Sequence, residues 1–563
     1  MHRRRGRTSP SVEREEVEKN LRYLEENEEQ EGNNQKDDNN DEEEDEDVLR
    51  AMTVEGIRDR MQQMRQDVLE QVNEQWNEML SDVLQRLEAN VSGSGSGNKI
   101  FEDTDKYVDR RKSQKEGILS DKRFQPRNSL LTDLFKIKHF RTIYNIFVVI
   151  LIILFINTAV CDIVDTGSTH LGVRTIMLGF GKFPTVINIW LLMKGSTFAL
   201  YIIFSFWASQ RSTLPAKTLP RKILDYGCLA LFILYQAAFI ALPVKAILAE
   251  DLPPVSSLVV LMEQVRLLMK THAFVRSTAP KMMLEESQKL QKTQKSQVDI
   301  SGSSKCPGFS KFLYFMFAPT LVYRDSYPRT QQINWRKVIW NYTEVVLVVF
   351  YVAFVFERFL VPDFRQFGEH PLEPRALILS IFSTMMPGIL VFLCGFYCLL
   401  HSWMNGSAEL LRFADRMFYK DWWNSTSYDA YYRTWNVVVH DWLYTYIYKD
   451  MYEIVTPRNK VLSTFTVFAV SAIFHEYILA FAFRFFYPVM LLMFGGIGLV
   501  LVFLTRKHDK AGGNIFVWLT LCIGSGVLLS LYSMEYYARI NCPPYQDSFL
   551  DLFLPRSWTC HRL

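Results

Sequence analysis

The chain has 563 residues, a net charge of +3 and 49% hydrophobic residues, yet its mean hydropathy is close to zero. That average hides two unlike parts, because residues 1–133 are highly charged and residues 134–563 contain a series of long apolar runs. A helix that crosses a bilayer needs about 20 apolar residues, so the composition excludes a wholly soluble protein. The charges are segregated along the chain rather than gathered on one basic face, so we expect no nucleic-acid partner.

The N-terminal segment begins MHRRRGRTSP and has no apolar stretch behind it. We therefore expect no cleavable signal peptide, and the first internal span should direct the chain into the membrane. Residues 1–46 lead into the acidic run DEEEDED and are too polar to bury a core, which predicts a disordered acidic tail.

Residues 47–91 carry apolar side chains at three- and four-residue steps, the spacing of one stripe on a long amphipathic helix. With no soluble domain to cover the stripe, self-association as an oligomerisation helix is the favoured interpretation, and a helix lying on the membrane surface is the alternative. Residues 92–133, which begin with SGSGSG, read as a flexible linker. The stripe consists of Ile57, Met61, Met64, Val68, Val72, Trp76, Met79, Val83 and Leu87.

Residues 134–563 predict an all-α polytopic domain with about nine transmembrane helices. Lys194 interrupts the second run, Pro387 should bend the sixth, and the fourth is weak because it contains Glu263 and Arg266. The expected spans are Thr142–Cys161, Phe183–Ser209, Tyr226–Val244, Leu252–Met269, Val338–Phe356, Ala376–Leu400, Val461–Phe483, Phe485–Thr505 and Asn514–Met534.

Nine spans with a cytosolic N-terminus place most loop Lys and Arg residues in the cytosol, as the positive-inside bias requires. The same threading puts Cys542 and Cys560 in the lumen, where an oxidising environment allows them to form a disulfide. An eight-span arrangement would leave both cysteines in the cytosol. The cysteines in or beside the apolar runs are interpreted as buried small hydrophobic residues.

His475 lies in the sequence SAIFHEY, inside an otherwise apolar span. An ionisable group at that depth is costly and is usually retained for function, and a neutral imidazole suits a general base. A structural histidine bonded to a neighbouring helix is the alternative. No second ligand stands at metal-binding spacing, so no metal is expected. Glu476 is expected to pair with a basic group.

A second feature is the aromatic cytosolic stretch that contains FYKDWWN and, shortly after it, YYRTWNVVVHDW. Aromatic faces suit an adenine ring and basic side chains suit phosphates, so this stretch is a candidate binding site. Asn436 and His440 are four residues apart and should share one helical face, from which both could donate to a carbonyl oxygen. An amphipathic helix anchored by Trp and Tyr in the headgroup region is the alternative.

These motifs resemble those of the membrane-bound O-acyltransferases. The residues Phe418, Tyr419, Asp421, Trp422, Trp423 and Asn424 match the FYxDWWN signature of the enzymes that esterify sterols and diacylglycerol. FAPTLVYRDSYPRT, TWNVVVHDW, SAIFHEY and the final RSWTC look like the sterol O-acyltransferases in particular. The resemblance runs from about residue 134 onward, and the preceding region is similar only in kind.

The resemblance implies a role for individual residues. His475 corresponds to the catalytic histidine of the family, and Asn436 to the asparagine that positions the thioester. Ala430 stands where relatives can carry Asn, which leaves one contact to CoA in question. Residues that would line the path of acyl-CoA are Arg433, Asn436, His440, Tyr448, Lys460 and Ser471, and His139 would lie near a sterol site.

The activity implied is direct transfer of a long-chain acyl group from acyl-CoA to the 3β-hydroxyl of a sterol, without an acyl-enzyme. Acyl-CoA is a co-substrate, and no cofactor is expected. Diacylglycerol or another alcohol as acceptor, and a non-catalytic sterol-binding scaffold, are the alternative functions. The resemblance also implies a multi-pass protein of the endoplasmic reticulum membrane that forms a homo-oligomer, as a dimer of dimers.

Overall fold

The computed structural model describes residues 119, 121–167, 172–215, 218–293, 306–368, 373–505, 511–544 and 548–559. The expected acidic tail, the oligomerisation helix and most of the linker lie outside these residues. Within the described residues the regular structure is helical, and strand-like pairing is limited to two isolated bridges, Arg127 with Asp415 and Arg329 with Phe413.

The α-helices are α4 (Leu130–Leu134), α5 (Lys138–Thr166), α6 (Val173–Gly179), α7 (Phe183–Thr213), α8 (Leu219–Ala249), α9 (Pro254–Thr293), α10 (Phe309–Phe317), α11 (Trp335–Val355), α12 (Val361–Phe364), α13 (Pro374–Phe396), α14 (Met404–Leu410), α15 (Tyr428–Trp435), α16 (Val437–Leu443), α17 (Lys460–Phe483), α18 (Gly498–Thr505), α19 (Ala511–Asn541) and α20 (Ser548–Phe553). Five π-helical segments continue or join them: η1 (Phe356–Leu360), η2 (Tyr397–Trp403), η4 (Tyr444–Tyr448), η5 (Met451–Val455) and η6 (Leu491–Ile497). Two short 3₁₀ segments are η3 (Trp422–Asn424) and η7 (Arg556–Trp558).

Seven helical stretches of the described chain are long and apolar enough to cross a bilayer. They contain seven of the nine expected spans: those in α5, α7, α8, α11, α13, α17 and α19. The all-α polytopic fold class is therefore confirmed, and the chain is a multi-pass membrane protein. The count of nine stays a prediction.

The two remaining expected spans are helical but differ from the apolar ideal. From Pro254 onward, the expected span Leu252–Met269 forms the first part of the long helix α9, in which Glu263 and Arg266 lower the apolar character. Phe485–Thr505 becomes helical as a 15-residue apolar stretch only from Leu491, because the chain first makes a turn with Arg484 in the left-handed region at φ 62°. Pro488 follows in that turn, and a proline favours such a helix start.

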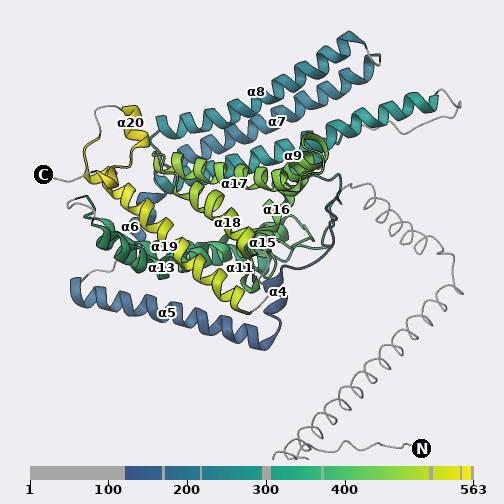
Figure 1. The fold of residues 1–563 in the computed structure, drawn as a ribbon. Coiled ribbons are helices and arrows are strands. Elements are labelled where there is room, and N and C mark those ends of the chain that lie inside the picture. The colour runs from purple at the N-terminus through teal and green to yellow at the C-terminus, as the bar shows by residue number, and fades with distance from the viewer. Residues whose placement is uncertain are drawn as a thin grey trace, which may run out of the picture. The chain divides into compact units, whose positions relative to one another are not determined.

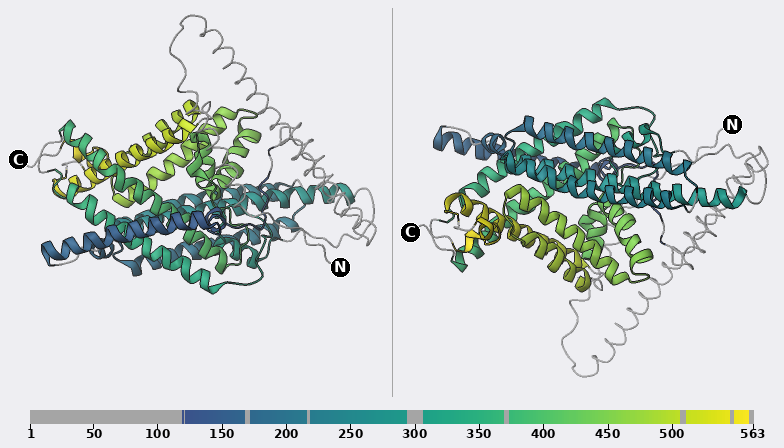
Figure 2. Two further views of the ribbon diagram at one scale, coloured as in Figure 1. Left: turned by 90° about the horizontal axis from the view of Figure 1, so that it is seen from below. Right: turned by 90° about the horizontal axis from the view of Figure 1, so that it is seen from above.

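Helix α17 lies between two groups of helices. Figure 1 shows α7, α8 and α9 on one side of it and α18, α19 and α13 on the other, and Figure 2 shows the same neighbours from below and above. Helix α17 packs against α9 on one side and against η6 on the other. Residues on α17 therefore lie at the centre of the membrane domain.

Helices α13 and α19 make the most extensive helix pair, and small residues permit their close approach. A Cβ added at Gly526 would lie 2.8 Å from the carbonyl oxygen of Ile381, so only glycine fits there. Thr384 bonds across the pair, with its hydroxyl 2.6 Å from that of Ser530. Such small-residue contacts with interhelical hydrogen bonds are how helices associate in lipid, where apolar burial supplies little driving force.

The unexpected charge of Lys194 is matched by the charges that weaken α9. Its ammonium lies 3.2 Å from Glu263, which also accepts from Trp190 and Arg266. Lys270, one turn further along, is fully buried and donates to three carbonyl oxygens at the end of α10. Buried charges of this kind are tolerated when they are paired or hydrogen-bonded, so the cluster ties α7, α9 and α10 together.

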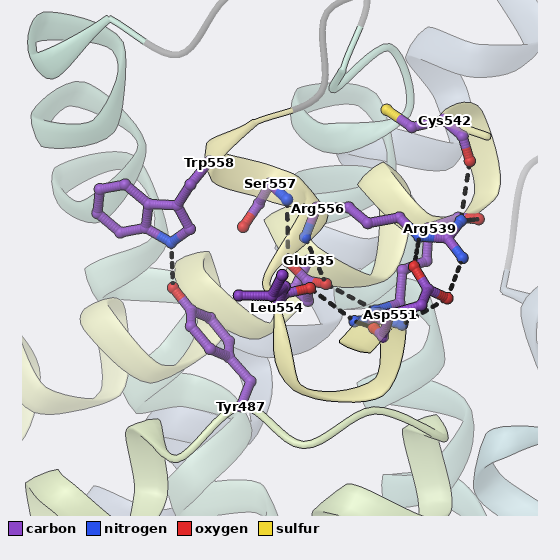
Figure 3. Close-up of polar contacts among 9 residues, drawn as sticks. All are labelled: Tyr487, Glu535, Arg539, Cys542, Asp551, Leu554, Arg556, Ser557 and Trp558. Carbon is purple, nitrogen blue, oxygen red and sulfur yellow. Dashed lines mark hydrogen bonds and ion pairs between the residues drawn. The ribbon is translucent and has the colours of Figure 1, made fainter. Parts of the chain in front are cut away.

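The segment after α19 folds back onto the domain (Figure 3). Glu535 is fully buried and accepts from the backbone N–H groups of Arg556 and Ser557 at 3.1 and 3.0 Å. Arg556 in turn donates to Asp551 and to the carbonyl of Cys542. Trp558 donates to the hydroxyl of Tyr487, which precedes η6, at 2.9 Å. Cys542 is disulfide-bonded; its expected partner Cys560 lies outside the described residues, so that pairing stays a prediction.

Candidate active site

His475 lies on α17, and its side chain is exposed although the helix is central. The ring nitrogen Nδ1 is 2.7 Å from the carbonyl oxygen of Ser471, one turn earlier. A carbonyl oxygen only accepts, so this bond requires the hydrogen on Nδ1 and leaves the lone pair on Nε2. The Ser471 contact therefore leaves Nε2 available to accept a proton, as a general base must.

The face of the imidazole is covered by Phe494 of η6. The two ring centroids are 5.2 Å apart with an interplanar angle of 28°, a stacked arrangement. Phe494 also contacts Tyr432 of α15 and Phe468 of α17. Through Tyr432, the helix that carries Arg433 is linked to the histidine.

Glu476 does not pair with a basic group, contrary to the sequence-based expectation. Its carboxyl accepts from the backbone N–H of Leu491 at 2.9 Å and from the hydroxyl of Tyr532 at 3.1 Å. No ion pair to Glu476 is present among the described residues. A hydroxyl and a helix-start amide satisfy a buried carboxyl here in place of a cation, which sequence spacing does not reveal.

Three rings of the FYKDWWN motif are buried. Phe418, Tyr419 and Trp422 are 1%, 0% and 2% exposed, and they form a core with α13, α15 and α19. Trp422, for example, contacts the rings of Phe396 and Trp435. The three buried rings of the motif therefore present no face to a ligand. Asp421 and Asn424 are exposed, and Trp423 is half-buried.

The buried motif holds the junction between α15 and α16. The carbonyl of Phe418 accepts from Val437 N–H at 2.9 Å, and Lys420 N–H donates to the carbonyl of Thr434 at 2.8 Å. These two backbone bonds flank Asn436, which stands at the junction. The buried motif therefore fixes the position of Asn436, a polar residue outside the motif.

Asn436 is the N-cap of α16 rather than a residue within it. Its Oδ1 accepts from Val439 N–H at 3.1 Å, as N-cap side chains do. Because Oδ1 is bonded to Val439, the group left to donate is the Nδ2 amide. No described residue accepts a hydrogen bond from Nδ2. The Asn436 carbonyl accepts from His440 N–H at 3.0 Å, so the two residues are one turn apart, with Asn436 at the helix start and His440 within the helix. That both side chains donate to one carbonyl oxygen stays a prediction.

Four rings stand at four-residue steps along α16, η4 and η5. His440, Tyr444, Tyr448 and Tyr452 have adjacent centroids 6.4, 5.8 and 6.0 Å apart and interplanar angles of 11°, 13° and 6°. All four are half-buried. We call this row the aromatic ladder; it joins two of the expected acyl-CoA residues, His440 and Tyr448, into one surface.

A strap formed by residues 121–127 is bonded to the segment that bears the ladder. Lys122 pairs with Asp441, and Lys449 pairs with Asp121 at 2.7 Å. Burial raises the pKa of Asp441, but the neighbouring His440 ring and the charge of Lys122 outweigh burial and leave that pKa below its ordinary value. Lys449, a basic side chain of the aromatic stretch, is thus already paired.

The other expected site residues lie further out. The Arg433 side chain is 58% exposed and pairs with Asp429, and Lys460 is exposed at the first position of α17. His139 is exposed near the start of α5. Within the described residues, no hydrogen bond or ring contact joins His139, Lys460 or Asn436 to His475. Ala430 fills the third helical position of α15, where its N–H donates to the cap residue Ser427.

An apolar groove of about 640 Å³ lies elsewhere, between α8 and α17. Val244, Tyr477 and Phe481 are among its lining residues. On an α-helix, residues two and six positions after His475 point to the opposite side. The groove is therefore separate from the face that carries the imidazole.

The model of the membrane-bound O-acyltransferase family matches residues 176–534. The chain belongs to this family. The match spans both the buried motif and the histidine, and it confirms the family expected from the sequence.

Several relatives of this acyltransferase are sterol O-acyltransferases, the group that its motifs resemble. Sterol O-acyltransferase 1 of Mus musculus is 42% identical over 440 residues, which cover 78% of this chain and 79% of the relative. Sterol O-acyltransferase 2 of Rattus norvegicus is 41% identical over 454 residues, covering 80% and 83%. The human sterol O-acyltransferase 2 is 40% identical over 454 residues, covering 80% and 82%.

Sequence reasoning missed several residues that the acyltransferase places around its site. Tyr444 and Tyr452 continue the series His440–Tyr448 at the same spacing, a signal that the sequence contains. Phe494 and Tyr532 carry no such signal, because their contacts with His475 and Glu476 arise between separate helices.

Proposed function

We propose that this acyltransferase transfers a long-chain acyl group from acyl-CoA to the 3β-hydroxyl of cholesterol or a related sterol, with His475 as general base. The observation that carries the assignment is an accessible imidazole at the centre of the membrane domain, with Nδ1 held by the Ser471 carbonyl. The relatives named sterol O-acyltransferase support the sterol as acceptor.

The chemistry follows from the two oriented groups. Nε2 of His475 takes the proton of the sterol hydroxyl as its oxygen attacks the thioester carbon. The Asn436 amide donates from Nδ2 to the oxygen that becomes negative. The carbon–sulfur bond then breaks, the imidazolium returns its proton to the leaving thiolate, and a sterol ester and CoA result. Base catalysis of this type is worth roughly 10²–10⁴-fold in rate, and one oxyanion donor roughly 10²–10³-fold.

We assign the binding of CoA to the surface that carries the aromatic ladder. The aromatic ladder offers flat faces to an adenine ring, and Arg433 and Lys460 are exposed cations that suit phosphates. Tyr448 and His440 would lie along the acyl-CoA path as part of the ladder. Ser471 contributes through its carbonyl, and His139 is assigned to the sterol side.

The cellular setting is part of the same proposal. The chain would act in the endoplasmic reticulum membrane with its N-terminus in the cytosol and its C-terminal segment in the lumen, as a homo-oligomer built as a dimer of dimers. The disulfide at Cys542 supports an oxidising compartment for that segment.

The decisive experiment compares purified wild-type and His475→Ala protein with radiolabelled oleoyl-CoA and either cholesterol or diacylglycerol. We expect cholesteryl ester from wild type only, a fall of at least about 10²-fold for the variant, and unchanged binding of acyl-CoA. The same melting temperature for both proteins serves as the folding control. Normal turnover by His475→Ala would remove the base assignment, and esterification of diacylglycerol alone would change the acceptor.

A further inference from the structure

Three helices meet at the carboxyl group of Glu476. It lies on α17, accepts from Leu491 N–H at the start of η6, and accepts from the hydroxyl of Tyr532 on α19. The Tyr532 hydroxyl also accepts from Met490 N–H at 3.2 Å and lies 3.1 Å from the carbonyl of Tyr487. The side chain of Glu476 is 3% exposed, so all these contacts are shielded from solvent.

The carboxyl fixes where η6 begins. The first N–H groups of a helix have no partner within it, and in a membrane domain an unsatisfied one is costly. Glu476 satisfies the N–H of Leu491 directly, and Tyr532 satisfies that of Met490. The first bond holds the helix start directly to the residue that follows His475 in the chain, and the second does so through Tyr532, which bonds to that residue.

The start of η6 determines the place of Phe494, three residues on. Phe494 stacks on the imidazole at 5.2 Å, and its neighbour Gly495 lies so close to α17 that an added Cβ would be 3.0 Å from the Cβ of Ala472. The π-helical turn, which is frequent at functional sites, spans both residues. A shift of the helix start would therefore move the ring that covers one face of His475.

The same helix start is also anchored from the segment after α19 (Figure 3). Trp558 donates to the hydroxyl of Tyr487. The carbonyl of Tyr487 accepts from the Tyr532 hydroxyl. Buried Glu535 on α19 holds Arg556 and Ser557, beside Trp558. A continuous set of bonds thus leads from this segment through Tyr487 and Tyr532 to Glu476.

We propose that Glu476 and Phe494 are positioning residues for the general base: Glu476 sets the start of η6, and Phe494 clamps the imidazole in the orientation that the Ser471 carbonyl selects. This inference rests on the proposed role of His475. In this role Glu476, the next residue after His475, positions the base without contacting the substrate. Misplacement of a reacting group by about 1 Å costs on the order of 10²-fold in rate, which sets the scale of the effect.

The test uses full-length protein and the cholesterol assay. Glu476→Ala removes the acceptor of Leu491 N–H, and we expect kcat to fall about 10²-fold while KM for acyl-CoA stays within about twofold. Glu476→Gln keeps an oxygen for that N–H and should restore at least about a tenth of the wild-type kcat. Phe494→Leu keeps an apolar side chain without the stacked ring and should lower kcat about tenfold. Phe503→Leu is the matched control, because Phe503 follows on α18 and is 50% exposed.

A double-mutant cycle with His475→Ala separates positioning from general stability. If Glu476 and Phe494 act through the base, neither Glu476→Ala nor Phe494→Leu lowers the residual rate of the His475→Ala protein further. Wild-type kcat in both Glu476→Ala and Phe494→Leu would overturn the positioning role while leaving the base intact. Equal losses in Glu476→Ala and Glu476→Gln, with additive effects in the His475→Ala background, would also overturn it. Full activity of His475→Ala itself would instead defeat the proposed function.

Discussion

The FYKDWWN region and the α17–η6 face are both rich in aromatic rings, but the rings serve different ends. In the first, Phe418, Tyr419 and Trp422 are buried among other rings, and the motif acts through two backbone bonds beside Asn436. In the second, Phe494 lies against an imidazole that remains accessible. The most recognisable motif is thus a scaffold, and the groups suited to chemistry stand next to it or on another helix.

The largest effect should come from the scaffold. Trp422→Ala removes a buried ring that contacts Phe396 and Trp435, and such truncations cost about 3–5 kcal/mol. We expect poor yield and a much lower melting temperature in detergent, with activity lost in proportion to folded protein. His475→Ala is the comparison, since it should lose activity and keep its melting temperature. An unchanged melting temperature for Trp422→Ala would contradict the scaffold role.

Asn436 stands beside the first region and is proposed to act with the base of the second, and two substitutions can separate its capping role from its proposed catalytic role. Asn436→Asp keeps the cap acceptor for Val439 N–H but has no amide donor, so stability should hold while kcat falls roughly 10²–10³-fold. Asn436→Ala loses both and should also lose about 1 kcal/mol of stability. Melting curves and kcat are the measurements. Wild-type kcat in Asn436→Asp would leave only the capping role.

The exposed cations should affect binding rather than turnover. Arg433→Ala and Lys460→Ala should raise KM for acyl-CoA several-fold with little change in kcat, because both lie on the surface away from the imidazole. Arg433→Lys and Lys460→Arg keep the charge and should recover part of the affinity. An unchanged KM in both alanine variants would leave this surface without a phosphate role.

The smallest effect concerns the strap. The folded state lowers the pKa of Asp441, so its ion pair with Lys122 stabilises the protein above the pKa of an unfolded aspartate, about 3.9, and is lost as pH falls through the lower folded-state pKa. Asp441→Asn should cost about 1 kcal/mol at pH 7. It should also flatten the decline in stability below about pH 4. Melting temperature against pH tests this, and parallel curves for both proteins would contradict it.

The sequence predicted what depends on local composition. Seven spans follow from apolar runs, and His475 stood out because an ionisable residue within such a run is rare. Features set by contacts between distant segments were not predictable in this way. Glu476 was assigned to a cation because the sequence does not show that Tyr532, 56 residues away, reaches it. The aromatic motif was considered a ligand surface because composition does not distinguish an exposed ring from a buried one.

Some differences between the predicted and the observed structure had a local sequence signal, but the pattern of apolar residues was given more weight. Pro488 marks the turn that delays the helix of the expected span Phe485–Thr505 until Leu491. The four-residue repeat of His440, Tyr444, Tyr448 and Tyr452 is visible in the sequence, but its meaning depends on a helix that continues through η4 and η5. Capping by Asn436 likewise depends on where α16 begins.

The bond between Trp558 and Tyr487 has a consequence for biosynthesis. Trp558 follows every membrane helix in chain order, so this bond forms only after all of them have been translated. Until then, the turn before η6 lacks one of its anchors. The Trp558–Tyr487 contact is therefore among the last to form during synthesis, after the membrane helices that it joins.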